Sequence, residues 1–463
     1  MSMLRISILG VLSAALAACG SSEPPLPPEI DCLGGGYRLI DGTVVGVIPR
    51  SADDLRYQLI TGETGVLLPT EDGAWQSAED GVTVTLGSCG EGPFVFDDGS
   101  SVREGEKIPY VVTETVFDGV DGKRAGRLVL PEGGSADAII VALHGSEAWS
   151  GRTGDRFQTI MPAFGVGIFA YDKRGTGASD GAYTQDFFLL AEDATLARDE
   201  ALRLYGSETL IGYHGPSQGG WVGPLAAAKG DVDFVIASYG MAESALAEDR
   251  EEVFLDLREA GHSEDVIEKA REITDATGRV MASNFKSGYK ELDAVREKYA
   301  DEPWYEDIEG EFTRQFLDAP NLGLRIIGPF RSAGTPWDYD PRSTIEGLDV
   351  PQLWVIAEDD RSAPSGPTIA ILKEIQETKD DLDLVIFPDT DHGIIEFIEA
   401  ADGTRSYTKV ADGYYALVRD YALTQRTELS VDGPEVFLSA PLEVFEEVDA
   451  EESGLPSGDR PQP

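Results

Sequence analysis

Short apolar runs alternate with longer amphipathic stretches over most of the chain after residue 109. The runs IIVAL, VGIFAYD, TLIGY, DFVIASY, PQLWVIA and LDLVIF are β-rich and bounded by turn residues, as buried parallel strands are. Between them, DFFLLAEDATLARDEALRLYG and TIAILKEIQETKD have the spacing of helices. This alternation predicts an α/β domain over 109–425, with a mostly parallel sheet and helices on both of its faces.

Residues 31–108 follow a different pattern. YRLIDGTVVGVIPR, LRYQLITGETGVLLP, VTVTLGS and FVFDDG are short β-rich runs punctuated by Gly and Asp. They predict a small β-rich N-terminal domain. The sequence indicates no chemistry for this domain.

About a hundred residues separate the run DFVIASYG from the run PQLWVIA. Apolar residues recur at helical spacing in ALAEDREEVFLDLREAG, SEDVIEKAREITDATGRVMASN, GYKELDAVREKYA and WYEDIEGEFTRQFLD. They predict a helical insertion at 241–341, expected to form a cap over the functional site. The alternative is a helical appendage far from that site. The aromatic residues that could line the pocket or pack in the core are Trp304, Tyr305, Phe330 and Trp337.

Two Gly-x-Ser-x-Gly motifs compete for the role of nucleophile, one around Ser217 and one around Ser179. A nucleophilic serine on a sharp turn needs a strand directly before it and a helix directly after it. Ser217 has both, in ETLIGYH and QGGWVGPLAAAKG. The strand before Ser179 ends at Asp172, and loop-forming residues follow. The context favours Ser217 as the nucleophile and Ser179 as a turn residue.

A serine nucleophile requires an imidazole to take its proton and a carboxylate to orient that imidazole. Ser217 is followed by Asp360 in AEDDRSAP and by His392 in DTDHGI, and this order of nucleophile, acid and histidine is the α/β-hydrolase arrangement. The chain has four histidines, and His392 alone follows Asp360. The predicted catalytic residues are Ser217, Asp360 and His392, with Asp359 as a rival to Asp360.

The segment from about Tyr110 to Gln425 resembles bacterial α/β-hydrolases of the serine-aminopeptidase and acyl-thioesterase-like branch. Beside the triad, three stretches carry this resemblance: IIVALHGS (139–146), YDKRGTGASDG (171–181) and DYDPRSTIEGLDVPQLWVIAEDD (338–360). The resemblance implies an α/β-hydrolase fold with a cap insertion. Its G-x-x-D turn followed by a proline favours Asp360 over Asp359, although Ala357 stands at the glycine position.

Two backbone N–H groups are expected to form the oxyanion hole. One is that of Gln218, directly after the nucleophile, and the second comes from the loop after IIVALHG, with Ser146 as the first choice. Because main-chain atoms carry these roles, Gly145 and Glu147 are alternative donors for the second position.

The N-terminus, MSMLRISILGVLSAALAACG, resembles a bacterial lipoprotein signal. The resemblance implies a signal peptide at 1–18, a lipidated Cys19, and a location in the bacterial cell envelope, on the periplasmic side or at the outer membrane. A Pro-rich tether is expected at 19–30. In an oxidising compartment the two other cysteines, Cys32 and Cys89, predict a disulfide, and two unpaired buried thiols are the alternative.

The formal net charge of −47 argues against nucleic-acid binding. Residues 426–463 are predicted to form an acidic C-terminal extension that is partly disordered. No Zn-type Cys/His spacing, P-loop or convincing dinucleotide motif is present, so neither a cofactor nor a metal is expected. The oligomeric state stays open.

These observations predict a serine hydrolase that cleaves a carboxylic ester or thioester through an acyl-enzyme, anchored to a membrane by its N-terminal lipid. The triad does not separate this activity from a serine exopeptidase acting on short peptides, because both pass through the same tetrahedral chemistry. A third possibility is a non-catalytic binding lipoprotein with the hydrolase fold.

Overall fold

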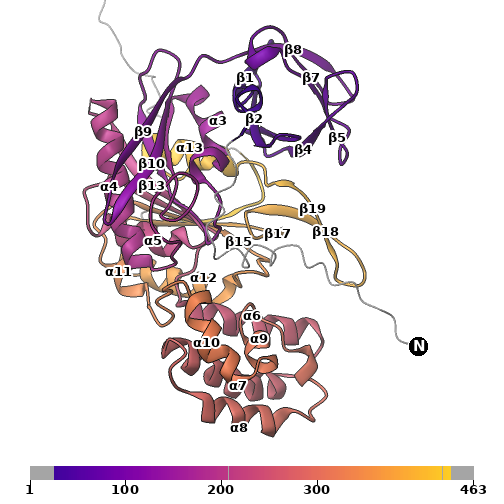
Figure 1. The fold of residues 1–463 in the computed structure, drawn as a ribbon, viewed down its shortest axis with the longest axis vertical. Coiled ribbons are helices and arrows are strands. Elements are labelled where there is room, and N and C mark those ends of the chain that lie inside the picture. The colour runs from indigo at the N-terminus through magenta and orange to yellow at the C-terminus, as the bar shows by residue number, and fades with distance from the viewer. Residues whose placement is uncertain (1–25, 207, 430, 440–463) are drawn as a thin grey trace, which may run out of the picture.

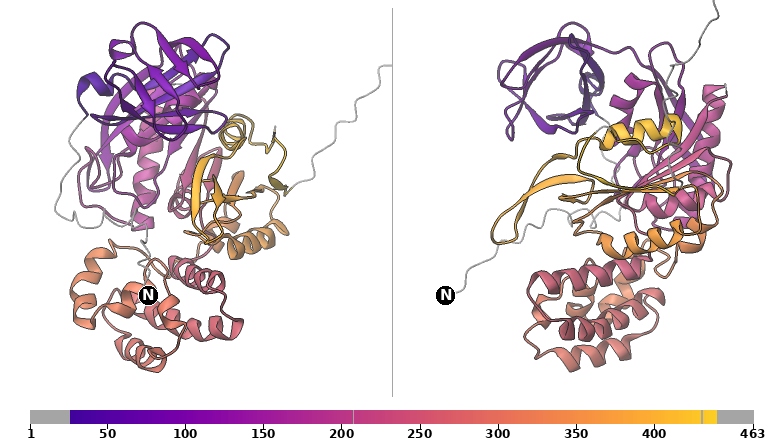
Figure 2. Two further views of the ribbon diagram at one scale, coloured as in Figure 1. Left: turned by 90° about the vertical axis from the view of Figure 1, so that its right-hand side faces the viewer. Right: turned by 180° about the vertical axis from the view of Figure 1, so that it is seen from behind.

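The computed structural model of the chain describes residues 26–206, 208–429 and 431–439. The expected signal peptide, Cys19 and most of the tether lie outside these residues. Figure 1 shows three parts: a β-barrel, a central α/β domain and a helical insertion. The barrel and the insertion lie at opposite ends of the central domain, and the two further views agree (Figure 2).

The N-terminal β-rich domain is a closed barrel of antiparallel strands. Alternate strand residues point inward, and Tyr37 stacks on Phe94 in the barrel core. Pairing of the first strand with the last closes the barrel, and a disulfide joins Cys32 to Cys89. The strands are β1 (Gly35–Leu39), β2 (Val44–Ser51), β3 (Asp54–Leu59), β4 (Thr64–Pro69), β5 (Trp75–Ser77), β6 (Thr83–Thr85), β7 (Phe94–Asp97) and β8 (Val102–Lys107), with the short helices α1 (Pro28–Asp31) and η1 (Ser88–Gly90).

The central domain contains a nine-stranded mixed sheet in the order β20-β16-β15-β14-β13-β11-β12-β10-β9. The strands from β16 to β12 in this order are parallel, and those at both edges are antiparallel. The strands are β9 (Val111–Gly119), β10 (Gly122–Leu130), β11 (Ala138–Ala142), β12 (Val166–Tyr171), β13 (Leu210–Pro216), β14 (Phe234–Ser238), β15 (Gln352–Ala357), β16 (Leu382–Phe387) and β20 (Glu435–Phe437).

Helices cover both faces of this sheet, as the sequence predicts. One face packs on α4 (Phe187–Tyr205), α5 (Gly219–Ala227) and α12 (Ser365–Gln376). The other packs mainly on α13 (Tyr414–Thr424). The central strands are buried on both faces, which explains their continuous apolar sequences. The remaining helices of this domain are α2 (Gly151–Gly154), α3 (Phe157–Ile160), η2 (Met161–Phe164) and α11 (Arg342–Glu346).

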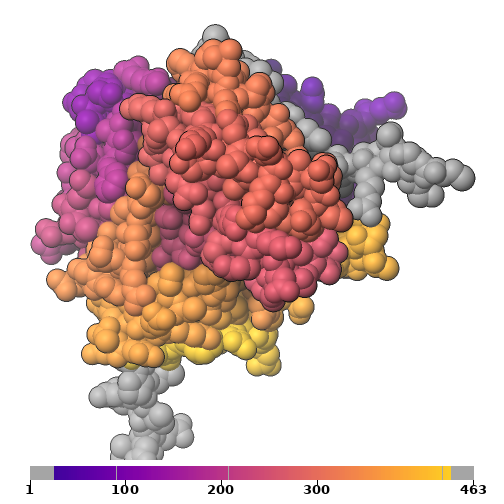
Figure 3. Space-filling view, turned by 90° about the horizontal axis from the view of Figure 1, so that it is seen from below, coloured from indigo at the N-terminus to yellow at the C-terminus, as the bar shows by residue number. Residues whose placement is uncertain are grey.

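The insertion between β14 and β15 is helical, as predicted, and it faces the viewer in Figure 3, which shows the molecule from below. Its helices are α6 (Ala245–Glu259), α7 (Glu264–Ala282), α8 (Tyr289–Tyr299), η3 (Tyr305–Asp307), α9 (Thr313–Asp318) and α10 (Asn321–Arg331). A second small sheet, β17 (Thr390–Asp391), β18 (Ile395–Glu399) and β19 (Arg405–Val410), follows β16.

Two segments and one side chain differ from the sequence prediction. WYEDIEGEFTRQFLD was expected to be one helix, but the chain breaks at Gly310, whose φ of 74° a continuous helix does not allow. The segment expected to be an acidic extension contributes β20, which pairs with β16. Of the four aromatic residues singled out, Phe330 is exposed, whereas the other three are core residues.

Candidate active site

Ser217 lies on a sharp turn between β13, which ends at Pro216, and α5, which begins at Gly219. Its φ of 51° is a left-handed conformation that a serine adopts only under constraint. The turn is so tight that a Cβ on Gly215 would lie 2.2 Å from the carbonyl oxygen of Gly219. A glycine is therefore required at 215, and the turn presents the Ser217 side chain beyond the carboxyl end of the strand.

The structure brings Ser217, His392 and Asp360 together in one hydrogen-bonded chain. His392 Nε2 lies 3.2 Å from Ser217 Oγ, and His392 Nδ1 lies 2.8 Å from Asp360 Oδ2. The other carboxylate oxygen of Asp360 accepts hydrogen bonds from the backbone N–H groups of Ser362 and Ala363, at 2.9 and 2.8 Å. Asp360 is buried and held at both oxygens, so its orientation toward His392 is fixed.

Asp359 and Ser179, the rivals of the predicted acid and nucleophile, have other places. Asp359 is exposed, and its backbone carbonyl accepts a hydrogen bond from Arg405. Ser179 Oγ donates to the carbonyl of Asp172 and accepts from the N–H of Ala125, which ties a surface turn to the sheet. Neither side chain is hydrogen-bonded to His392.

The three other histidines are occupied elsewhere. His144 contacts the carbonyl oxygen of Tyr171, His214 lies 3.1 Å from Ser238 Oγ, and His262 pairs with Asp307. Burial lowers the pKa of His214 to about 3, so this imidazole is neutral at physiological pH.

The pKa of His392 reflects two opposing causes. Burial favours the neutral imidazole, but the charge and hydrogen bond of Asp360 favour the imidazolium, and the net result is a raised pKa. The ring of Tyr239 meets the imidazole edge to face at a centroid distance of 4.9 Å. An imidazole with a carboxylate behind it and a serine in front can take the serine proton and hold the resulting charge.

Backbone N–H groups that could form an oxyanion hole are available beside Ser217. Among the described residues, none accepts a hydrogen bond from the N–H of Ser146 or of Gln218. The same holds for the alternatives Gly145 and Glu147. The loop is close to the nucleophile, because a Cβ on Gly145 would lie 3.6 Å from the Cβ of Ser217.

The helical insertion reaches the site through the turn at 310–313. Carboxylates on one face of α6 accept hydrogen bonds from this turn: Asp256 from the N–H of Gly310, Glu252 from that of Glu311, and Asp249 from that of Thr313. These contacts hold the turn that carries Glu311. The insertion also contacts the acid loop, because Glu259 on α6 pairs with Arg361.

The Glu311 carboxylate interacts electrostatically with His392. Desolvation by the groups packed around it raises the pKa of Glu311 to about 7, although the side chain itself is solvent-accessible. The charge of Asp249 adds to this shift, and His392 opposes it. Burial likewise raises the pKa of Glu248, another carboxyl group of the insertion, and the charges of Glu311 and Asp360 are among the further causes. The insertion therefore contributes carboxyl groups near the triad that carry a negative charge only above their raised pKa values.

Sequence reasoning did not identify Glu311 or Tyr239 as site residues. Glu311 is one acid among 84 acidic residues, and nothing in the sequence shows that it faces His392. Tyr239 reads as one more residue at the end of a buried strand.

Neither a metal site nor a membrane span is found in the part of the chain that the structure describes. No group of three or more His, Cys, Asp or Glu side chains there could hold a metal ion. None of the helices there has the length and apolar character needed to cross a bilayer.

No protein-family model matches the chain, and no curated protein matches it significantly. Among solved structures, the chain is similar to an esterase of Pyrococcus furiosus at 14% identity and a TM-score of 0.39, covering 62% of this chain and 84% of that one. An acylaminoacyl peptidase of Pyrococcus horikoshii is similar at 14% identity and a TM-score of 0.42, covering 83% of this chain and 55% of that one. A proline iminopeptidase of Mycobacterium smegmatis is similar at 17% identity and a TM-score of 0.36, covering 61% of this chain and 92% of that one. Likenesses this weak decide nothing about function.

Proposed function

We propose that this protein is a serine hydrolase of the α/β-hydrolase fold that cleaves a carboxylic ester or thioester through an acyl-enzyme. The observation that supports this proposal is the hydrogen-bonded chain from Ser217 through His392 to Asp360, on a strained strand-to-helix turn. Geometry of this kind activates a hydroxyl that is otherwise a weak nucleophile.

The reaction begins when Ser217 Oγ attacks the substrate carbonyl and His392 Nε2 takes the hydroxyl proton. Asp360 keeps Nδ1 protonated and stabilises the imidazolium. The N–H groups of Gln218 and Ser146 bind the oxyanion of the tetrahedral intermediate. Collapse of this intermediate expels the alcohol or thiol, which receives the proton from His392. Water then attacks the acyl-enzyme while His392 takes a proton from it. Collapse of the second tetrahedral intermediate releases the acid and returns the proton to Ser217.

The same proposal includes a location in the cell envelope, with the chain held to a membrane by a lipid on Cys19. Its support is the lipoprotein-like N-terminal sequence, together with the pairing of Cys32 with Cys89, since disulfides persist in oxidising compartments.

A fluorophosphonate probe is expected to label the wild-type protein, and Ser217→Ala is expected to abolish labelling because the probe reacts with the activated hydroxyl. Ser179→Ala, which removes the serine of the rival motif, should remain labelled. Gel fluorescence measures the labelling, and hydrolysis of p-nitrophenyl esters measures the activity. Persistent labelling of Ser217→Ala would remove this serine from the mechanism. A wild type inert to the probe, esters, thioesters and aminoacyl amides would favour the non-catalytic binding lipoprotein.

A second candidate function is exopeptidase activity toward substrates with a free amino group, and the carboxylate of Glu311 near His392 favours it. An ammonium group next to the scissile carbonyl would find a negative charge there. Because the pKa of Glu311 is raised to about 7, its charge is present above that pH and lost below it.

If this second function is correct, Glu311→Gln should lower kcat/KM for an aminoacyl p-nitroanilide by about tenfold, the equivalent of ~1.4 kcal/mol. The N-acetylated substrate has no ammonium group, so its kcat/KM should change far less. Glu309→Gln makes the same change two residues earlier in the chain and is the matched control. Equal losses for both substrates, or a wild-type preference for simple esters at every pH, would exclude amine recognition by Glu311.

A further inference from the structure

Lys173 is a buried cation for which no ion pair with a carboxylate is found among the described residues, although the charge of Glu147 acts on it. It lies two residues after the end of β12 and is 1% exposed, and burying an ammonium group is costly unless other groups compensate it. In the described part of the chain, its one hydrogen bond goes from Nζ to the carbonyl oxygen of Gly145, at 2.8 Å. Nζ also lies 4.9 Å from the centre of the Tyr183 ring, within reach of a cation–π interaction.

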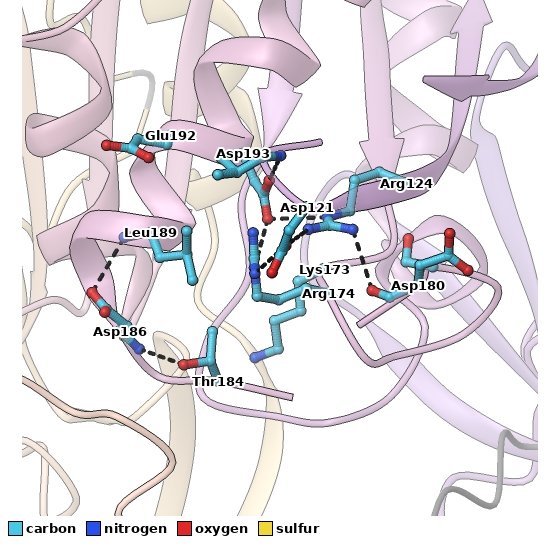
Figure 4. Close-up of polar contacts among 12 residues, drawn as sticks. Asp121, Arg124, Lys173, Arg174, Asp180, Thr184, Asp186, Leu189, Glu192 and Asp193 are labelled. Carbon is cyan, nitrogen blue, oxygen red and sulfur yellow. Dashed lines mark hydrogen bonds and ion pairs between the residues drawn. The ribbon is translucent and has the colours of Figure 1, made fainter. Parts of the chain in front are cut away.

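The neighbouring Arg174 shows the contrast. Its guanidinium pairs with Asp193 at 2.8 Å and with Asp121 at 2.6 Å. Figure 4 shows Arg174 pointing into this cluster of charges and the Lys173 side chain leading away from it. Of two adjacent cations, one is neutralised by carboxylates, and the other is directed at a backbone carbonyl next to the nucleophile.

The loop after β11 is therefore held by two donors. Lys173 Nζ donates to the carbonyl of Gly145, and the Tyr183 hydroxyl donates to the carbonyl of Ser146. In a planar trans peptide the C=O and the N–H point in opposite directions. Anchoring these carbonyls on one side turns the N–H groups of Ser146 and Glu147 to the other side. The N–H of Ser146 belongs to the same peptide unit that Lys173 holds.

We propose that Lys173 is a positioning residue of the oxyanion hole, which fixes the Gly145–Ser146 peptide so that the Ser146 N–H faces the oxyanion formed at Ser217. This inference rests on the proposed serine-hydrolase function. The positive charge behind the peptide also polarises its carbonyl and strengthens the N–H as a donor. Lys173 acts through the backbone and does not touch the substrate.

The charge of Lys173 depends on pH. Burial lowers the pKa of Lys173 to about 8, and the charge of Glu147 opposes this shift. The titratable groups that face it are Glu147 and His144 on the loop after β11 and Tyr183 before α4. Burial lowers the pKa of His144 and raises that of Tyr183 to about 12. The ammonium form is present below about pH 8, so kcat should decline above that pH as the charge is lost.

Replacing Lys173 with methionine, which keeps the length of the side chain, should lower kcat roughly 10- to 100-fold, below the ~10²–10³-fold loss of a whole oxyanion donor. KM should change by less than about twofold, because the hole acts on the transition state. The alkaline decline of kcat should also disappear. The measurements are ester hydrolysis from pH 6 to 10 and circular dichroism to confirm folding. Lys123→Met, at an exposed lysine, is the matched control.

Tyr183→Phe removes the second anchor with little change in volume and should lower kcat in the same way, so it decides the question if Lys173→Met does not fold. Folded variants with wild-type kcat and an unchanged alkaline decline would overturn the positioning role, while fluorophosphonate labelling of the wild type would still support the hydrolase proposal. A wild type that does not label would overturn both.

Discussion

An Asp360→Asn variant is expected to lose about 10⁴-fold in kcat while remaining folded, the size of effect seen when a triad carboxylate becomes an amide. Asparagine retains an oxygen that can accept from the N–H groups of Ser362 and Ala363. Its NH₂ group would then donate to His392 Nδ1, which places the imidazole proton on Nε2. That tautomer cannot accept the proton of Ser217, so the nucleophile is not activated.

Asp359→Asn is the matched control, because it makes the same chemical change at the adjacent, exposed position. It should keep kcat within about twofold of wild type, in line with the small effects of surface substitutions. Initial rates on p-nitrophenyl esters and the rate of fluorophosphonate labelling measure both variants. A larger loss in Asp359→Asn than in Asp360→Asn would show that Asp359, and not Asp360, is the acid of the triad.

The sheet and the geometry of the triad could be predicted because both depend on local patterns. Runs such as IIVAL and VGIFAYD are buried on both faces, and this burial is visible in their composition. Ser217 and His392 come after strands whose carboxyl ends meet at one edge of the sheet. The order of the residues along the chain then left His392 as the predicted partner of Ser217.

What the sequence could not show depends on pairings between distant segments. Closure of the barrel requires β1 to pair with β8, and β20 pairs with β16 although many residues of chain separate the two strands. The sequence of α6 is rich in Glu and Asp, and nothing in it distinguishes acids that hold a turn from acids that face solvent. In the structure, Asp249, Glu252 and Asp256 hold the turn that carries Glu311, whose charge acts on His392. No local pattern encodes such contacts.

Asp193→Ala is expected to destabilise the catalytic domain by about 3–5 kcal/mol, because it leaves buried charges without their partner. Asp193 is 1% exposed and accepts from Arg124 Nε at 3.0 Å and from Arg174 Nε at 2.8 Å (Figure 4). Both guanidiniums are almost fully buried. Asp121 also contacts both, but it is 67% exposed and cannot replace a buried carboxylate.

Glu192→Ala is the matched control, one residue away on the same helix. Glu192 pairs with Lys229 at the surface, where both side chains are well exposed, and such pairs contribute about 0–1 kcal/mol. Urea unfolding, followed by loss of fluorophosphonate labelling at Ser217, reports on the catalytic domain rather than on the barrel. Equal midpoints for the two variants would mean that water or Asp121 compensates the buried arginines. A large shift for Asp193→Ala alone would show that this buried ion cluster stabilises the domain at Arg174, the neighbour of the lysine that we place behind the oxyanion hole.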